Sequence, residues 1–151
     1  MPVDGTGKNL RTCLKVEELY DMLAALPSQK VAVFLDACFS GVKRNGTSLN
    51  NARGVAIKVK QNTPKGNVIV FSAAQDDETA YAYRKGKHGL FTYYLLRKLK
   101  ETAGEVTYGE LSTYIMDQVV KTSIKENGKK QTPCTIPSTS LSANWKKIKI
   151  K

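Results

Sequence analysis

An acid and a thiol lie two residues apart, directly after a short apolar run. The run covers residues 31–35, and Asp36 and Cys38 follow it. Because side chains alternate along an extended strand, these two groups would point to the same side. A short continuous apolar run is typical of a strand buried on both faces, and open α/β sheets carry their chemistry at the carboxyl ends of such strands. The pattern therefore predicts an active site with Cys38 as the nucleophile.

A cysteine nucleophile reacts as the thiolate, so it needs a nearby cation, a helix N-terminus or a base. Asp36 would give the opposite help, because a neighbouring carboxylate raises the pKa of a thiol. A histidine is therefore required, and the chain holds a single one, His88, far downstream of Cys38. The alternative interpretation of Cys38 is a buried structural thiol, the commonest state of a free cysteine.

Periodicity predicts the elements that would position these groups. Apolar runs predict buried strands at residues 31–35 and 67–74. Apolar residues at helical spacing predict amphipathic helices in three segments: 16–26, 89–100 and 107–125. This alternation of strands and helices indicates an α/β fold.

Local signals mark the ends of these elements. Pro27 would end the first helix and Gly128 the last, while Thr107 and Glu110 have the spacing of a capping box. Residues 131–140 are proline-punctuated and predict a loop or an edge strand, in which Cys134 would be a packing residue. The tail, residues 145–151, alternates apolar and basic residues and predicts an edge strand whose lysines discourage further pairing.

The stretch Asp36-Ala37-Cys38-Phe39-Ser40-Gly41 resembles the nucleophile motif of the caspase-like cysteine peptidases (peptidase C14), in the form seen in metacaspases and bacterial caspase-like domains. Two further blocks follow in the order of that family. Residues 67–80 resemble its next strand and acidic loop, and residues 88–96 resemble its Gly-x-Phe-Thr helix start. The resemblance implies a three-layer α/β/α domain with a mainly parallel sheet.

The resemblance also implies roles for single residues. Cys38 would be the nucleophile, and its backbone N–H would form part of the oxyanion hole. Asp36 and Asp76 would line the S1 pocket and bind a P1 Arg or Lys through charge-assisted hydrogen bonds. Alternatively, Asp36 is a strand-end acid satisfied by backbone N–H groups, and Asp76 caps a turn or a helix. Asp77 is the less favoured neighbour for the substrate contact.

The position of the histidine departs from the family pattern. In that family the base precedes the cysteine, in a His-Gly pair, whereas no histidine precedes Cys38 here. His88-Gly89 lies in the later block, so we interpret His88 as a helix-end or surface residue rather than as the base. We therefore expect the base, and the glycine that completes the oxyanion hole, upstream of Met1 or on another chain. Residues 1–151 would then form a single, partial caspase-like domain.

The formal net charge of +11 indicates a basic surface. Basic residues gather in segment 42–66, which carries no acid, and in the tail. Segment 42–66 is interpreted as a solvated surface loop, or as the cleavable activation loop that caspase-like enzymes carry after the nucleophile. Neither region interleaves aromatic residues as a base-stacking surface does, which makes nucleic acid an unfavoured partner.

The sequence gives little support for a membrane protein, a secreted protein, a disulfide-rich protein or a metal-binding protein. No apolar run has membrane-spanning length and no signal-peptide pattern opens the chain, so we expect a cytoplasmic protein. The three cysteines are too few and scattered for a disulfide framework or a zinc site. Asp76, Asp77 and Glu78 are adjacent rather than alternating, which is not calcium-loop spacing. We therefore assign no cofactor and leave a calcium requirement open.

The leading hypothesis is a cysteine endopeptidase domain that cleaves peptide or protein substrates after Lys or Arg, with a histidine from outside this sequence. The alternative is a catalytically silent caspase-like module that binds protein partners or assembles with copies of itself, because missing upstream strands would expose a sheet edge. A nucleic-acid-binding fragment is a third and weaker hypothesis, based on the charge alone.

Overall fold

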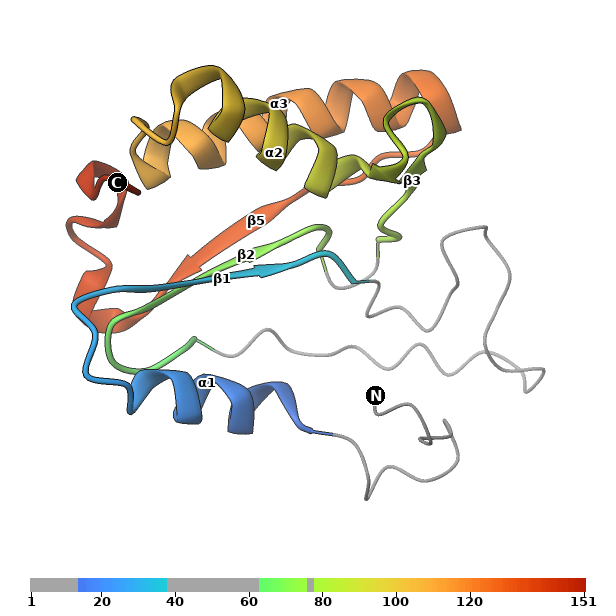
Figure 1. Ribbon diagram of the computed structural model, residues 1–151. Helices are drawn as coiled ribbons and strands as arrows, with labels where there is room; N and C mark the ends of the chain where they lie inside the picture. Colours follow the sequence, from blue (N-terminus) through green and yellow to red (C-terminus); the bar gives the residue numbers. More distant parts are fainter. Residues whose placement is uncertain (1–13, 38–62, 76–77) are drawn as a thin grey trace, which may run out of the picture.

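The computed structural model describes three stretches of the chain: residues 14–37, 63–75 and 78–151. Within them, a central sheet lies between helices on both faces (Figure 1). Helix α1 (Val16–Ala24) covers one face, and helices α2 (Leu90–Thr102) and α3 (Tyr108–Asn127) cover the other. The predicted three-layer α/β/α arrangement and its three helices are confirmed.

The central sheet has the strand order β1-β2-β5. β1 (Val31–Leu35) runs parallel to the central strand β2 (Val68–Ser72), and β5 (Cys134–Pro137) runs antiparallel on the other side of β2. The two apolar runs are therefore strands as predicted, and segment 131–140 contains an edge strand. The parallel expectation holds for β1 and β2, whereas β5 makes the described sheet mixed. Cys134 is half-buried in β5.

β2 is buried along its whole length. Its side chains alternate, so that Ile69 and Phe71 join the larger core under α2 and α3, while Val68 and Val70 pack with Tyr20 of α1. A strand covered on both faces needs an unbroken apolar run, which is the pattern that the sequence shows. The helices contribute these fully or nearly fully buried residues to the larger core: Leu90, Phe91, Leu111, Ile115 and Val119.

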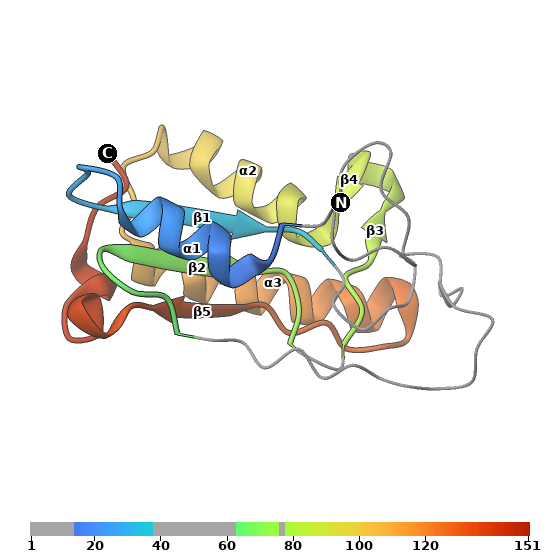
Figure 2. The ribbon, with the colours of Figure 1, turned by 90° about the horizontal axis from the view of Figure 1, so that it is seen from below.

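A short hairpin precedes α2. β3 (Ala82–Tyr83) pairs antiparallel with β4 (His88–Gly89), and the 3₁₀ turn η2 (Arg84–Gly86) joins them. We call these residues the 82–89 hairpin. Its strands have two residues each, too few to produce an alternating pattern, so periodicity did not predict it. In Figure 2 the hairpin lies beyond the arrowhead of β1, at the carboxyl edge of the sheet.

The start of α3 carries the predicted capping box. The Glu110 N–H donates to Thr107 Oγ1 at 3.2 Å, and the Thr107 N–H donates to Glu110 Oε2 at 2.9 Å. Hydrogen bonds from the Thr107 backbone and then from its hydroxyl lower the pKa of Glu110. Gly128 ends the helix with a φ of 64°, the left-handed conformation that glycine adopts readily.

The tail differs from its prediction, since residues 145–151 do not form a strand of the central sheet. After the turn η3 (Thr139–Leu141), the segment Trp145–Lys147 forms a second 3₁₀ turn, η4. Beyond it, the Tyr108 N–H donates to the Ile148 carbonyl at 2.9 Å and the Ile150 N–H donates to the Val106 carbonyl at 3.0 Å. The alternating apolar residues of the tail pack against the larger core, which explains why their spacing resembles that of an edge strand.

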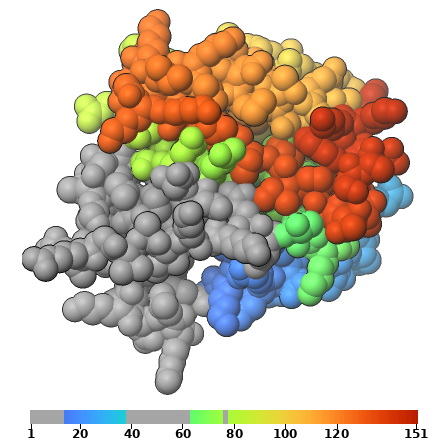
Figure 3. Space-filling model, turned by 180° about the vertical axis from the view of Figure 1, so that it is seen from behind, coloured from blue at the N-terminus to red at the C-terminus, as the bar shows by residue number. Residues whose placement is uncertain are grey.

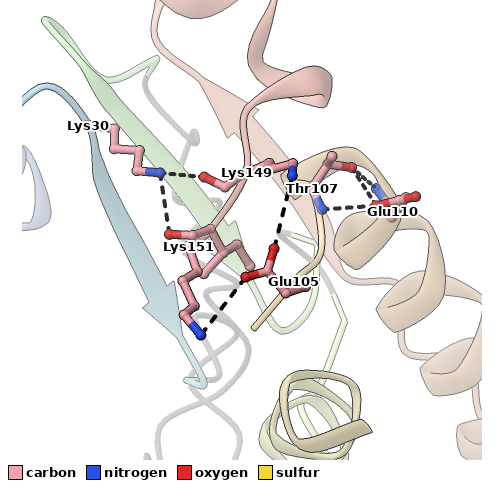
Figure 4. A network of polar contacts seen from close by, with 7 residues as sticks. Lys30, Glu105, Thr107, Glu110, Lys149 and Lys151 are labelled. Atoms are coloured by element: carbon pink, nitrogen blue, oxygen red, sulfur yellow. Dashed lines mark hydrogen bonds and ion pairs between the residues drawn. The ribbon is translucent and has the colours of Figure 1, made fainter. Parts of the chain in front are cut away.

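Polar contacts hold the end of this tail in place (Figure 4). Lys30 Nζ donates to the carbonyls of Lys149 and Ile150, and Glu105 lies 4.0 Å from Lys149 Nζ and 3.9 Å from Lys151 Nζ. Seen from behind, the C-terminal part of the chain (red) lies beside α3 (orange) (Figure 3). The tail thus joins the start of β1 to the start of α3.

Candidate active site

The carboxyl end of β1 delivers an acid to the first turn of α2. Asp36 follows the last residue of β1, and its Oδ2 atom accepts a 2.5 Å hydrogen bond from Thr92 Oγ1. Thr92 lies near the start of α2, and the N-terminal end of a helix favours a negative charge nearby. The Asp36 side chain is therefore held at the junction of strand and helix.

Gly89 provides the space that this carboxylate occupies. A Cβ atom on Gly89 would lie 2.2 Å from Asp36 Oδ2, far inside van der Waals contact. Gly89 has a φ of −65°, which any L-residue adopts, so the requirement is for space and not for an unusual backbone conformation. Asp36, Gly89 and Thr92 thus form one close-packed unit.

A pocket of about 570 Å³ opens beside this unit. Its walls come from the end of β1, the first turn of α2 and the 82–89 hairpin. These residues line it: Asp36, Ala82, Tyr83, Arg84, Lys87, His88, Gly89 and Thr92. The pocket therefore combines a carboxylate with two side chains, Arg84 and Lys87, that are positively charged at neutral pH.

Aromatic packing and an ion pair anchor the hairpin. The Tyr83 ring meets the Tyr93 ring of α2 edge-on, with centroids 4.8 Å apart. At the turn, Lys85 Nζ lies 2.8 Å from Glu126 Oε1 near the end of α3. This hydrogen bond raises the pKa of Lys85 and lowers the pKa of Glu126, so both groups are charged at neutral pH. The hairpin is consequently held against both helices.

A buried glutamine joins the end of β2 to the start of the hairpin. Gln131 Nε2 donates to the Ala73 carbonyl, and Gln131 Oε1 accepts from the Tyr81 N–H, each at 2.8 Å. Next to it, the carboxylate of Glu78 accepts hydrogen bonds from the N–H and hydroxyl of Thr132. The sequence pattern placed Gln131 in a loop or edge strand and gave it no role, because no local pattern signals contacts this distant in the chain.

The sequence model of a protein family described as the caspase domain matches residues 1–143. The chain belongs to the caspase domain family. Cysteine peptidase-type function follows from this membership. No curated protein gives a significant match to the chain.

The predicted site residues of this caspase domain divide into two groups. Asp36 lines the pocket, whereas Cys38 and Asp76 lie outside the described residues. The described residues just before these two positions are neighbours in space, because β1 and β2 are parallel with Leu35 opposite Ser72. The predicted loop at 42–66 also lies outside the described residues, apart from its last four positions.

His88 occupies a position that the sequence only partly predicted. It is exposed and is separated from the start of α2 by one residue, Gly89, in agreement with a surface residue at a helix end. It also lines the same pocket as Asp36, which sequence reasoning did not foresee. No sequence pattern indicates this position, because only the geometry of the hairpin brings His88 to this edge of the sheet.

Over the stretches 14–37, 63–75 and 78–151, no helix combines the length and the apolar character that crossing a membrane requires. In the same stretches, no three His, Cys, Asp or Glu residues are grouped so that they could hold a metal ion.

Proposed function

We propose that this caspase domain is a cysteine endopeptidase module that cleaves after Lys or Arg, with Cys38 as the nucleophile. The observation that carries the specificity is the placement of Asp36, whose carboxylate is fixed by Thr92 at the wall of a pocket. A carboxylate in such a position suits a guanidinium or ammonium group, because charge-assisted hydrogen bonds are stronger than neutral ones.

The proposed reaction follows the chemistry of a thiol nucleophile. The Cys38 thiolate attacks the scissile carbonyl carbon, and the Cys38 N–H contributes to the oxyanion hole. The C–N bond breaks, the amine leaves with a proton from an imidazolium, and water then hydrolyses the thioester. The base would be a histidine from outside residues 1–151, since the family pattern puts it before the cysteine and His88 comes after.

Asp76 is proposed as the second acid of the S1 pocket. It follows β2 as Cys38 follows β1, and these strands are parallel neighbours. Carboxyl ends of adjacent parallel strands lie at the same edge of a sheet, so both segments start from that edge. A guanidinium group can bind two carboxylates through its five donors, which suits Arg at P1.

The second candidate function is a catalytically silent module for protein interaction or self-assembly. It is favoured by β1, which pairs only with β2 in the described sheet. All five β1 residues are apolar and only half-buried. An apolar edge strand with unpaired backbone groups is a template for pairing with another chain. A monomer at high protein concentration, measured by analytical ultracentrifugation, would contradict this candidate.

Covalent labelling separates the two functions. The chain is treated with an irreversible ketone inhibitor that carries Arg at P1, and labelling is followed by intact-mass spectrometry. We expect labelling of Cys38 that is slower than in an enzyme that holds its histidine, because the thiol is then activated less. The Cys38→Ala variant should lose this labelling and the Asp36→Asn variant should slow it further, with little labelling by the matched inhibitor that carries Asp at P1. Labelling that survives Cys38→Ala would contradict the nucleophile, and no labelling of folded protein would favour the silent module.

A further inference from the structure

We infer that the pocket selects a basic residue that has an acidic neighbour in the peptide, with Arg84 and Lys87 as the residues that recognise the acid. This inference rests on the proposed function of the same site, in which Asp36 binds the basic side chain. It adds a second determinant of specificity, which comes from the 82–89 hairpin.

The two kinds of charge face one pocket. Asp36 lines it at the end of β1, while Arg84 and Lys87 line it on the side of the hairpin. A ligand that carries a single positive charge would pair with the Asp36 carboxylate but would offer no negative charge to Arg84 and Lys87. A peptide segment with both signs of charge complements all three groups, and charge complementarity across an interface governs specificity.

The charges of Arg84 and Lys87 are available to a ligand. Both side chains are exposed, and among the described residues no carboxylate lies within ion-pair distance of either one. Lys85, between them in sequence, differs because it is paired with Glu126 and does not line the pocket. The hairpin therefore carries one cation with a structural role, Lys85, and two cations that border the pocket, Arg84 and Lys87.

The backbone that carries these cations is well defined. Tyr83 pairs with His88 across the hairpin, and the Leu90 N–H donates to the Tyr81 carbonyl at 2.9 Å. Lys87 adopts the left-handed conformation, with a φ of 55°, and its N–H donates to the Arg84 carbonyl at 3.2 Å. The Cα positions of Arg84 and Lys87 are thus fixed relative to Asp36, although their long side chains can adjust to a peptide.

The overall charge supports the same preference. The chain carries 24 Lys and Arg residues against 13 Asp and Glu. A peptide with only basic residues would be repelled by this surface, even when one of its side chains fits the Asp36 carboxylate. A basic residue next to an acid avoids this conflict, because the acid meets Arg84 and Lys87 while the basic side chain meets Asp36.

Peptide binding to the Cys38→Ala form of the full chain tests the inference, since this form leaves the peptides uncleaved. Fluorescein-labelled peptides of one length carry a central Arg flanked on both sides by Glu, Gln or Lys, and a further peptide replaces the Arg by Gln. We expect the Glu-flanked peptide to bind about three- to tenfold more tightly than the Gln-flanked one, and the Lys-flanked one more weakly than both, as measured by fluorescence polarisation.

Three variants identify the groups responsible. Arg84→Gln combined with Lys87→Gln should abolish the advantage of the Glu-flanked peptide over the Gln-flanked one. Lys85→Gln is the matched control, because it removes a hairpin charge outside the pocket, and the advantage should persist. The advantage should also shrink as salt is raised from low to physiological concentration.

The outcomes separate this inference from the proposed function. Equal binding of the Glu- and Gln-flanked peptides, with binding still dependent on Asp36 and on the central Arg, overturns the acidic preference and leaves the basic pocket intact. The acidic preference is also overturned if Lys85→Gln removes the advantage of the Glu-flanked peptide as completely as Arg84→Gln combined with Lys87→Gln does. If Asp36→Asn and the loss of the central Arg leave binding unchanged, or if folded protein binds no peptide, both proposals fail.

Discussion

Thr92 Oγ1 and Asp36 Oδ2 are joined by a 2.5 Å hydrogen bond that links the first turn of α2 to the carboxyl end of β1. The two residues are 56 positions apart in the chain and belong to different motif blocks. One block carries the proposed nucleophile, and the other opens a helix with Gly89 and Thr92. This bond gives the two blocks a physical connection, because Thr92 of the second block positions the Asp36 carboxylate of the first.

Replacing the hydroxyl of Thr92 should weaken binding of a basic P1 side chain. Thr92→Val keeps the shape but removes the donor to the Asp36 carboxylate, whereas Thr92→Ser keeps the donor. A hydrogen bond to a charged group contributes about 1.5–3 kcal/mol, so we expect about tenfold or greater slowing of labelling by the Arg-P1 inhibitor in Thr92→Val. Thr92→Ser should remain within about threefold of the parent chain. Equal rates in both variants would contradict the positioning role of the hydroxyl.

The space at Gly89 makes a second prediction. Gly89→Ala should destabilise the domain by about 1–3 kcal/mol, because its new methyl group would overlap the Asp36 carboxylate. The cost should almost vanish in the Asp36→Ala background, since the overlapping atoms are then absent. Urea unfolding of the four proteins in this double-mutant cycle measures the coupling. A cost that is the same in both backgrounds would show that the clash lies elsewhere.

Local patterns predicted the elements of this fold well. The apolar runs that became β1 and β2 and the capping residues Thr107 and Glu110 carry their information within a few neighbouring positions. The position of Asp36 directly after β1 was likewise predicted from the end of the apolar run, whereas its substrate-binding role stays a prediction. The edge strand predicted for the tail was wrong, because alternating residues such as Ile148 and Ile150 pack on the core from an irregular backbone and not from the edge of the central sheet.

The features that the sequence did not predict, such as the position of the 82–89 hairpin and the role of Gln131, depend on contacts between segments that are distant in the chain. The 82–89 hairpin has two-residue strands, so its place beside Asp36 follows from the docking of Tyr83 on Tyr93 and not from any periodicity. For the same reason, no local pattern in the sequence singles out Arg84 and Lys87. Gln131 looked like a loop residue, although both ends of its side-chain amide are satisfied by backbone groups far away in the chain.

Gln131 makes a third prediction because its side chain is fully buried. Gln131→Leu would leave the Ala73 carbonyl and the Tyr81 N–H without their partner, and each buried polar group left unsatisfied costs about 1–3 kcal/mol. We expect a loss of about 3 kcal/mol in the free energy of unfolding, measured by urea denaturation. Gln29→Leu is the control, since Gln29 is exposed and should change stability by less than about 0.5 kcal/mol. Equal costs for the two variants would contradict the bridging role.

The capping box makes the last prediction, which concerns pH. Hydrogen bonds from the Thr107 backbone and hydroxyl lower the pKa of Glu110 below its ordinary value of 4.5. A carboxyl group whose pKa is depressed in the folded state contributes stability above its unfolded pKa and loses it as the pH falls through the folded pKa. The stability difference between the parent chain and Glu110→Gln should therefore be constant from pH 7 down to about pH 5 and shrink below about pH 4.5.

Two variants of α3 make this pH test specific. Thr107→Ala removes the side-chain cap, so it should cost about 1 kcal/mol at pH 7 and reduce the pH-dependent part of the Glu110 contribution. Asp117→Asn changes an exposed acid on the same helix, and its stability difference from the parent chain should not follow the pattern of Glu110→Gln. Urea denaturation at pH 7 and at pH 3 supplies all of these values. If the Glu110→Gln difference were the same at both pH values, the folded carboxylate would not be the group that stabilises the start of α3.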